Sequence, residues 1–136
     1  MTEPGAIRVT QSIAHPPSSV WTALTDPAVH SAWFAPGDIR PVVGHRFTLD
    51  MGPFGDTPCE VLVVEPEQLL SYSFGADPFL TTITWRLEPS DAGTLLSLEH
   101  AGFDLDSEMG NRAFQGMGAG WPGILTRIEP ALADLG

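Results

Sequence analysis

The stretch PPSSVWTALTDPAVHSAWFAP, residues 16–36, decides the fold because it encodes two short helices that meet at a corner. Pro17 suits the first turn of a helix, where its missing N–H costs nothing. Asp26 precedes a proline and is pushed out of helical geometry, so the first helix is expected to end just before it. Asp26 can then cap a second helix that has Pro27 in its first turn. That helix should end before Pro36.

The flanking sequence on the N-terminal side predicts a strand, and the sequence on the C-terminal side predicts a sheet. Residues 7–13, IRVTQSI, alternate in polarity, and the prolines that follow end the strand. Between Arg40 and Gly102, five further runs have period two and short connections rich in Gly, Pro and Asp, which indicates an antiparallel meander. The residues that share the mainly apolar face of each run are Phe47, Leu49 and Met51; Cys59, Val61 and Val63; Leu70, Tyr72 and Phe74; Thr81, Ile83, Trp85 and Leu87; and Leu96, Leu98 and His100.

The last segment changes to a helical period and predicts the element that covers the sheet. Apolar residues recur there at three- and four-residue steps, at Phe114, Met117, Trp121, Leu125, Ile128 and Leu132. The expected fold is therefore α+β, with a common core. Its predicted core members are Val20, Leu24, Val61, Val63, Ile83, Leu96, Leu98, Leu125 and Ile128.

Two features of this closing helix are unusual. Pro122 removes a helical hydrogen bond, so we expect a kink, a break or a helix start within one turn of residues 120–122. Gly116 and Gly120 are spaced to share a face, which would leave room for a ligand beneath the helix. The alternative is that the glycines mark an irregular or late-starting helix.

Composition limits the classes of function. The chain has 136 residues, which suggests one domain, 1–136, with a loose tail at residues 1–5. Its net charge of −11 repels phosphate groups, so neither nucleic acid nor an anionic membrane is an expected partner. No signal peptide or membrane span is recognisable, and the lone Cys59 favours a reducing compartment. We therefore expect a cytoplasmic location, while a homodimer is left open.

Three motifs, VWTALTDPAVHSAWF, GTLLSLEHAGF and GWPGILTRIEPAL, resemble the START-like (SRPBCC) superfamily. More narrowly, the chain is similar to the branch named after the C-terminal domain of the activator of the heat-shock-protein-90 ATPase. The resemblance spans roughly residues 7–135. It implies a helix-grip fold, in which a curved seven-stranded antiparallel sheet wraps a long C-terminal helix and two short helices lie between the first and second strands. It also implies a deep, mostly apolar cavity. Some members of the superfamily bind hydrophobic small molecules, and others are polyketide cyclases.

The inward positions of that fold provide a set of candidate ligand-binding residues. Large aromatic side chains near the open end of a helix grip would border a cavity, and Trp and Tyr combine apolar area with a polar atom. His100 is either a polar handle for a ligand or a core histidine satisfied by the backbone or by Tyr72. The predicted ligand-binding set is Trp33, Phe47, Tyr72, Phe74, Trp85, His100, Phe114, Met117 and Trp121.

No pattern indicates a metal, a cofactor or a nucleophile. His15, His30 and His45 lack the HxH or HExxH spacing, and the lone cysteine has no CxxC partner. His30 lies three residues before Trp33, so it either lines the cavity mouth or is partly exposed on the surface. The glycines of GMGAG follow no strand, which disfavours a dinucleotide site, and no nucleophile elbow is present. We expect no metal and no cofactor.

Three functions remain as hypotheses. The first is binding of a small hydrophobic or aromatic molecule in an internal cavity, without an assigned reaction. The second is an enzyme of the cyclase or dehydratase type that acts on a polyketide-like or aromatic substrate, with His100, Tyr72 or His30 as acid or base. The third is a co-chaperone-like interaction module, which is disfavoured because such activators carry a separate N-terminal domain.

Overall fold

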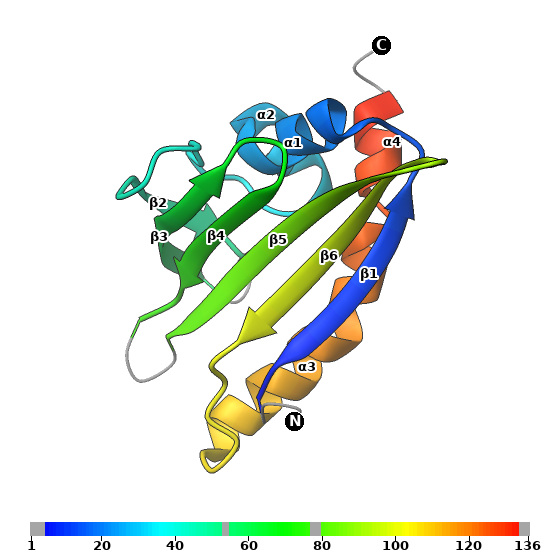
Figure 1. Ribbon diagram of the computed structural model, residues 1–136. Helices are drawn as coiled ribbons and strands as arrows, with labels where there is room; N and C mark the ends of the chain where they lie inside the picture. The colour runs from blue at the N-terminus through cyan, green and yellow to red at the C-terminus, as the bar shows by residue number, and fades with distance from the viewer. Residues whose placement is uncertain (1–4, 53–54, 77–79, 134–136) are drawn as a thin grey trace.

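A computed structural model describes residues 5–52, 55–76 and 80–133 (Figure 1). One curved antiparallel sheet has the strand order β1-β6-β5-β4-β3-β2, with the helices against its concave side. The α+β helix-grip prediction is confirmed, with six strands among the described residues where the resemblance implies seven. The elements are β1 Ile7–Ile13, α1 Pro17–Thr25, α2 Pro27–Trp33, β2 Arg46–Asp50, β3 Asp56–Glu65, β4 Leu69–Phe74, β5 Thr81–Ser90, β6 Gly93–Ala101, α3 Glu108–Leu125 and α4 Ile128–Ala133.

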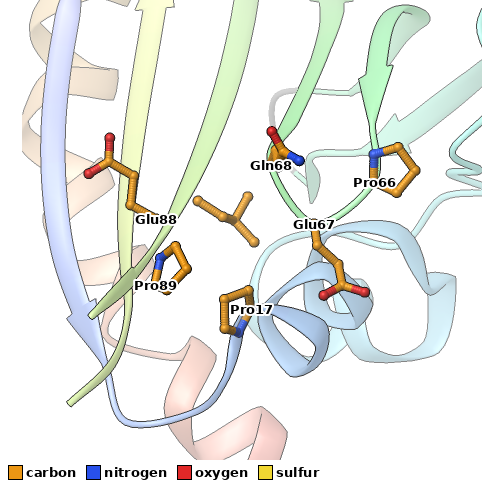
Figure 2. A pocket seen from close by; sticks show the side chains of 7 residues that line it. Pro17, Pro66, Glu67, Gln68, Glu88 and Pro89 are labelled. Carbon is orange, nitrogen blue, oxygen red and sulfur yellow. The ribbon is translucent and has the colours of Figure 1, made fainter. Parts of the chain in front are cut away.

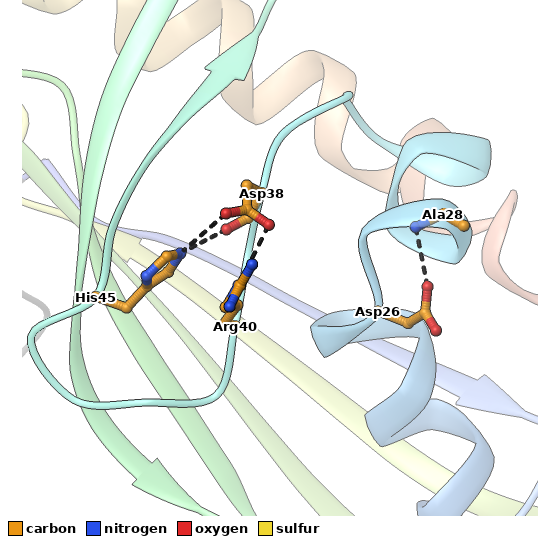
Figure 3. Close-up of polar contacts among 5 residues, drawn as sticks. All are labelled: Asp26, Ala28, Asp38, Arg40 and His45. Carbon is orange, nitrogen blue, oxygen red and sulfur yellow. Dashed lines mark hydrogen bonds and ion pairs between the residues drawn. The ribbon is translucent and has the colours of Figure 1, made fainter.

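The two short helices meet where the sequence predicts. Asp26 has an extended backbone, with φ −92° and ψ 120°, and its carboxylate caps α2 by accepting hydrogen bonds from the amides of Ala28 at 2.9 Å and Val29 at 3.4 Å (Figure 3). The indole N–H of Trp33 donates to the carbonyl of Ala23 at 2.8 Å. This bond joins the end of α2 to α1, so the corner and its aromatic residue are held as one unit.

A long connection joins α2 to β2 and is hydrogen-bonded to β2 and β3. It is anchored where the Asp50 amide donates to the Pro36 carbonyl at 2.8 Å. The His45 imidazole donates from Nε2 to the Asp38 carbonyl at 2.6 Å, and the Asp38 carboxylate lies 3.4 Å from Nε of Arg40 (Figure 3). The exposed ion pair contributes little, because water screens it. The connection places Ile39, which is fully buried, in the core.

Strand β6 lies inside the sheet, where it pairs with β1 on one side and with β5 on the other. Alternate residues of β5 and β6 point into the core, and the predicted core residues Ile83, Leu96 and Leu98 are buried. None of the described helices is both long and apolar enough to cross a membrane.

The prediction that Val63 belongs to the core is wrong. Its side chain is 40% exposed, whereas the other predicted core residues are at most 2% exposed. A bulge in β3 shifts the register, so that Val61 pairs with Tyr72 but Val63 pairs with Ser71. The extra residue moves the inward position to Val64, which packs against the core. Strict alternation fails here because a bulge inverts the side-chain phase of the strand.

The closing helix is interrupted, and its first part ends about one turn after Pro122. Helix α3 begins after Ser107, whose hydroxyl accepts from the Gly110 amide at 3.3 Å, and continues through Pro122 to Leu125. The break occupies residues 126–127, and α4 then begins. The Glu129 carboxylate of α4 accepts from the Ala14 amide at 2.7 Å, which ties the last helix to the end of β1.

The hypothesis that Gly116 and Gly120 leave room beneath the helix is wrong. Both are exposed, and a Cβ atom built on either one would meet nothing within 4 Å. Trp121 is fully buried and sets the inward face of the helix, so the residue directly before it must point outward. The glycine that faces the sheet is Gly118, whose Cβ would lie 3.8 Å from the Ile7 side chain.

The predicted tail falls mainly on residues 1–4, which lie outside the described residues. Gly5 is described and buried, and its carbonyl accepts from the Phe103 amide at 3.3 Å. This contact holds the residue before β1 against the segment that follows β6.

The turn between β3 and β4 contains a residue under backbone strain, which yields a stability prediction. The Gln68 amide donates to the Glu65 carbonyl at 2.9 Å, and Glu67 at the third turn position has φ 61°. Pro66 before it and the positive φ are the signature of a type II turn, which favours glycine there.

We expect Glu67→Gly to raise the free energy of unfolding by about 0.5–1 kcal/mol. Urea denaturation would measure this, with Glu65→Gly, in the strand, as a control that should destabilise.

Candidate functional site

The structure brings most of the predicted aromatic residues together between the sheet and helices α2 and α3. Trp33 and Trp85 have ring centroids 5.6 Å apart, as do Trp85 and Trp121, and both pairs meet edge to face. Phe34 lies 5.0 Å from Trp121 and is stacked on Trp33 at 5.6 Å. We call Trp33, Phe34, Trp85 and Trp121 the aromatic cluster. Each tryptophan of the cluster is at most 1% exposed, while Phe34 is half-buried.

The remaining predicted residues surround this cluster at different depths. Tyr72 is fully buried; its hydroxyl accepts from the Trp85 indole at 3.1 Å, and its ring meets Phe47 at 5.5 Å. Burial raises the pKa of the Tyr72 phenol well above its ordinary value. Phe74, Phe114 and Met117 are half-buried and pack against the edge of the core.

His100 lies in a chain of hydrogen bonds. Its Nδ1 accepts from the Trp121 indole at 3.0 Å, so the neutral ring carries its proton on Nε2. Nε2 donates to the Thr81 hydroxyl at 2.8 Å, and that hydroxyl donates to the Phe74 carbonyl at 2.9 Å. Both nitrogens of His100 are therefore engaged. It is satisfied by two side chains, rather than by the backbone or Tyr72 as the sequence suggested.

His30 is fully enclosed, which rules out the surface position considered from the sequence. It is 1% exposed, and its ring centroid lies 5.2 Å from that of Trp33 and 5.4 Å from that of Phe34. Its Nδ1 is 2.9 Å from the Ala35 carbonyl, to which it must donate. No described protein group hydrogen-bonds Nε2 of His30.

Sequence reasoning missed two aromatic residues of this region. Phe34 directly follows Trp33, and Phe103 lies 4.5 Å from His100 and 5.6 Å from Phe114. Both follow the last residue of an element, where neither helical nor strand periodicity assigns a direction to the side chain. Their aromatic character next to predicted site residues was the available signal.

Two hollows on the described surface, neither of them lined by a residue of the aromatic cluster, are large enough to hold a small molecule. The larger, about 550 Å³, is lined by Leu87 and by prolines and acidic residues of α1, β5 and the β3–β4 turn (Figure 2). The smaller, about 370 Å³, includes Phe47 from the predicted set. The cavity implied by the resemblance corresponds to neither hollow and stays a prediction. The space within the cluster is occupied by its own rings.

The described residues contain no group of three His, Cys, Asp or Glu side chains placed to hold a metal ion. Burial raises the pKa of the Cys59 thiol to about 12, so the thiol stays protonated and unreactive near neutral pH. The chemistry that this region can perform is recognition of an apolar surface, with neutral hydrogen-bonding groups at its edge.

The His100 chain predicts the effect of a matched pair of substitutions in β5. Thr81→Val removes the acceptor of the His100 Nε2 proton and leaves a buried donor without a partner. We expect it to lower the free energy of unfolding by about 1–3 kcal/mol. Thr82→Val, on the opposite face of the strand, should change the same quantity by less than about 0.5 kcal/mol. Equal effects in urea denaturation would contradict the hydrogen-bond assignment.

The buried histidines predict a loss of stability in mild acid. Desolvation lowers the pKa of His100 to about 3 and that of His30 to about 4, from the ordinary 6.5. Below pH 6.5 the unfolded chain therefore binds protons that the folded chain does not. The free energy of unfolding should fall between pH 6.5 and 5, by up to about 1.4 kcal/mol per pH unit for each histidine.

The His30→Phe variant should reduce this slope, because one of the two groups is gone. Denaturation measured at pH 7, 6 and 5 in wild type and variant would show it. A wild-type stability that stays level or rises from pH 7 to pH 5, with the same profile in the variant, would refute the prediction.

Comparisons with known proteins agree with this architecture. Protein MLL2253 from Mesorhizobium loti is 36% identical, covers 95% of this chain and 97% of its own, and superposes with a TM-score of 0.84. Protein BH1534 from Bacillus halodurans is 26% identical over 97% of this chain and 99% of its own, with a TM-score of 0.83. CalU16 from Micromonospora echinospora is 28% identical over 91% of this chain and 71% of its own, with a TM-score of 0.74.

No curated protein matches the chain in sequence. A family model does match, over residues 14–133, and describes the activator of Hsp90 ATPase homolog 1-like proteins. The matched range includes the α1–α2 corner, β2–β6 and both C-terminal helices. The chain therefore belongs to the family of activator of Hsp90 ATPase homolog 1-like proteins, within the START-like superfamily to which its motifs pointed.

Proposed function

We propose that this protein binds a small, uncharged aromatic or apolar molecule between the concave face of the sheet and helices α2 and α3. The observation that carries the proposal is the convergence of aromatic rings from α2, β5 and α3 on one place. The ring centroid of Trp85 lies 5.6 Å from that of Trp33 and 5.6 Å from that of Trp121. Ligand sites in proteins are lined mainly by such rings, with few polar groups among them.

The polar groups in this region favour an uncharged ligand. His30, His100 and Tyr72 all have pKa values shifted by desolvation toward their neutral forms. Among the residues that the structure describes, none of the buried ones is a lysine or an arginine. A charged ligand group would lose its hydration without gaining a counter-charge, which is strongly unfavourable.

Entry of a ligand requires the rings to separate, and Phe34 is the side chain placed to move. It is the half-buried member of the aromatic cluster, and it lies at the end of α2 with φ −126° and ψ −83°, outside helical geometry. Its ring contacts Trp33 on one side and Trp121 on the other. Displacement of Phe34 would expose both indoles to an incoming ring.

A fluorescence titration tests the proposal. The neutral probe N-phenyl-1-naphthylamine should bind the wild type, quench its tryptophan emission and itself become brighter, because it accepts excitation energy from the cluster indoles. Phe34→Ala should change the probe's Kd by about fivefold or more, since it alters the aromatic surface that the probe contacts. Met109→Ala provides the control, because Met109 is an exposed apolar residue at the start of α3, outside the cluster.

The two other hypotheses correspond to different results. Conversion of a bound aromatic or polyketide-like compound into product would favour the cyclase-type enzyme. If neither this probe nor 1-naphthol binds the wild type, the small-molecule proposal fails. Stimulation of an Hsp90 ATPase would then be the assay for an interaction module, the activity for which the family is named.

A further inference from the structure

We propose that Nε2 of His30 is the hydrogen-bond acceptor for the ligand, so that the ligand is an aromatic molecule bearing a hydroxyl or N–H group, such as a phenol. This inference rests on the proposed function and narrows its ligand class. It depends on the local geometry of one side chain at the end of α2.

The tautomer of His30 follows from its one hydrogen bond. The Ala35 carbonyl can only accept, so Nδ1, 2.9 Å away, carries the ring proton. Nε2, on the opposite edge of the neutral ring, therefore presents a lone pair and no proton. It can accept a hydrogen bond from a ligand but cannot donate one.

This lone pair is buried beside the aromatic cluster. His30 is 1% exposed, and no group in the described part of the chain donates to Nε2. Its ring meets Trp33 and Phe34 edge to face at 5.2 and 5.4 Å. Buried acceptors without a partner are rare in folded proteins because each forfeits its hydration. Because the His30 ring lies 5.4 Å from that of Phe34, a ligand ring that displaces Phe34 would come to lie next to His30.

The other ring nitrogens of this region are already engaged. Both nitrogens of His100 hydrogen-bond to side chains, and the Tyr72 oxygen accepts from Trp85. His30 is thus the histidine of this region with an unused acceptor among the described residues. The site should discriminate by hydrogen bonding, because a ligand without a donor would bury this nitrogen unpaired.

The low pKa of His30 supports the same discrimination. Desolvation lowers it to about 4, and the hydrogen bond to Ala35 offsets only part of that effect. The ring is therefore neutral at pH 7 and offers no charge to a carboxylate. A carboxylate would also place its lone pairs against that of Nε2, so an aromatic acid should bind more weakly than the corresponding phenol.

The experiment compares 1-naphthol with 1-methoxynaphthalene, which share a ring system and differ in the hydrogen-bond donor. Calorimetric or fluorescence titration of the wild type should give a Kd for 1-naphthol about tenfold lower than for the ether, the usual worth of one hydrogen bond. In His30→Phe the two Kd values should become equal. The matched control His45→Phe, in the connection before β2, should keep the wild-type preference.

A second measurement on the wild type does not depend on the folding of a variant. The ¹⁵N resonance of the unprotonated Nε2 of His30 should move upfield when 1-naphthol is added, and should not do so with 1-methoxynaphthalene. Binding of 1-naphthol without that shift, or equal wild-type affinities for the two compounds, would overturn the role of His30 and leave the proposed function standing. If neither compound nor N-phenyl-1-naphthylamine binds, the proposed function fails and this inference fails with it.

Discussion

The hydrogen bond from the Trp121 indole to His100 is the contact on which the arrangement of this protein depends. His100 is the next-to-last residue of β6 and lies between Ile7 of β1 and Ile83 of β5. The 3.0 Å hydrogen bond from Trp121 to His100 fixes both where α3 lies along the sheet and how α3 is rotated about its own axis. Because the bond is buried, any other rotation of α3 would leave an indole N–H and an imidazole nitrogen without partners.

That constraint accounts for the face that each part of α3 presents. With Trp121 directed inward, Gly118 one turn earlier approaches Ile7, and Leu125 one turn later enters the core. Gly120 must then face solvent, whatever its spacing from other glycines. The same bond brings the Trp121 ring against Trp85 and Phe34, and so completes the aromatic cluster.

The interior formed in this way is polar in places but uncharged. The His100 chain is satisfied from end to end, which allows a histidine to be buried at little cost as long as it stays neutral. His30 shares the neutrality but keeps a lone pair without a protein partner. The ligand selectivity that we propose for this region would come from these side chains rather than from the family fold.

Part of the site followed from local sequence. The Asp26-Pro27 pair placed Trp33 at the end of a short helix, and two-residue alternation placed Trp85 and His100 on the inner face of the sheet. These inferences succeed because a proline restricts its immediate neighbours and because a strand's side chains alternate. They fail at Val63, where a bulge shifts the phase, and they gave no direction to Phe34, which lies beyond the end of its helix.

The α+β class, the element order and the two-helix corner could be predicted from the sequence, because they depend on interactions between residues near one another in the chain. Tertiary structure decided which polar groups in the core are satisfied. Trp121 and His100 are 21 residues apart, and their bond exists only when α3 lies on β6. His30 differs, because its contacts with Trp33, Phe34 and Ala35 are all local, and only the burial of the ring in the folded chain leaves its Nε2 without a partner among the described residues.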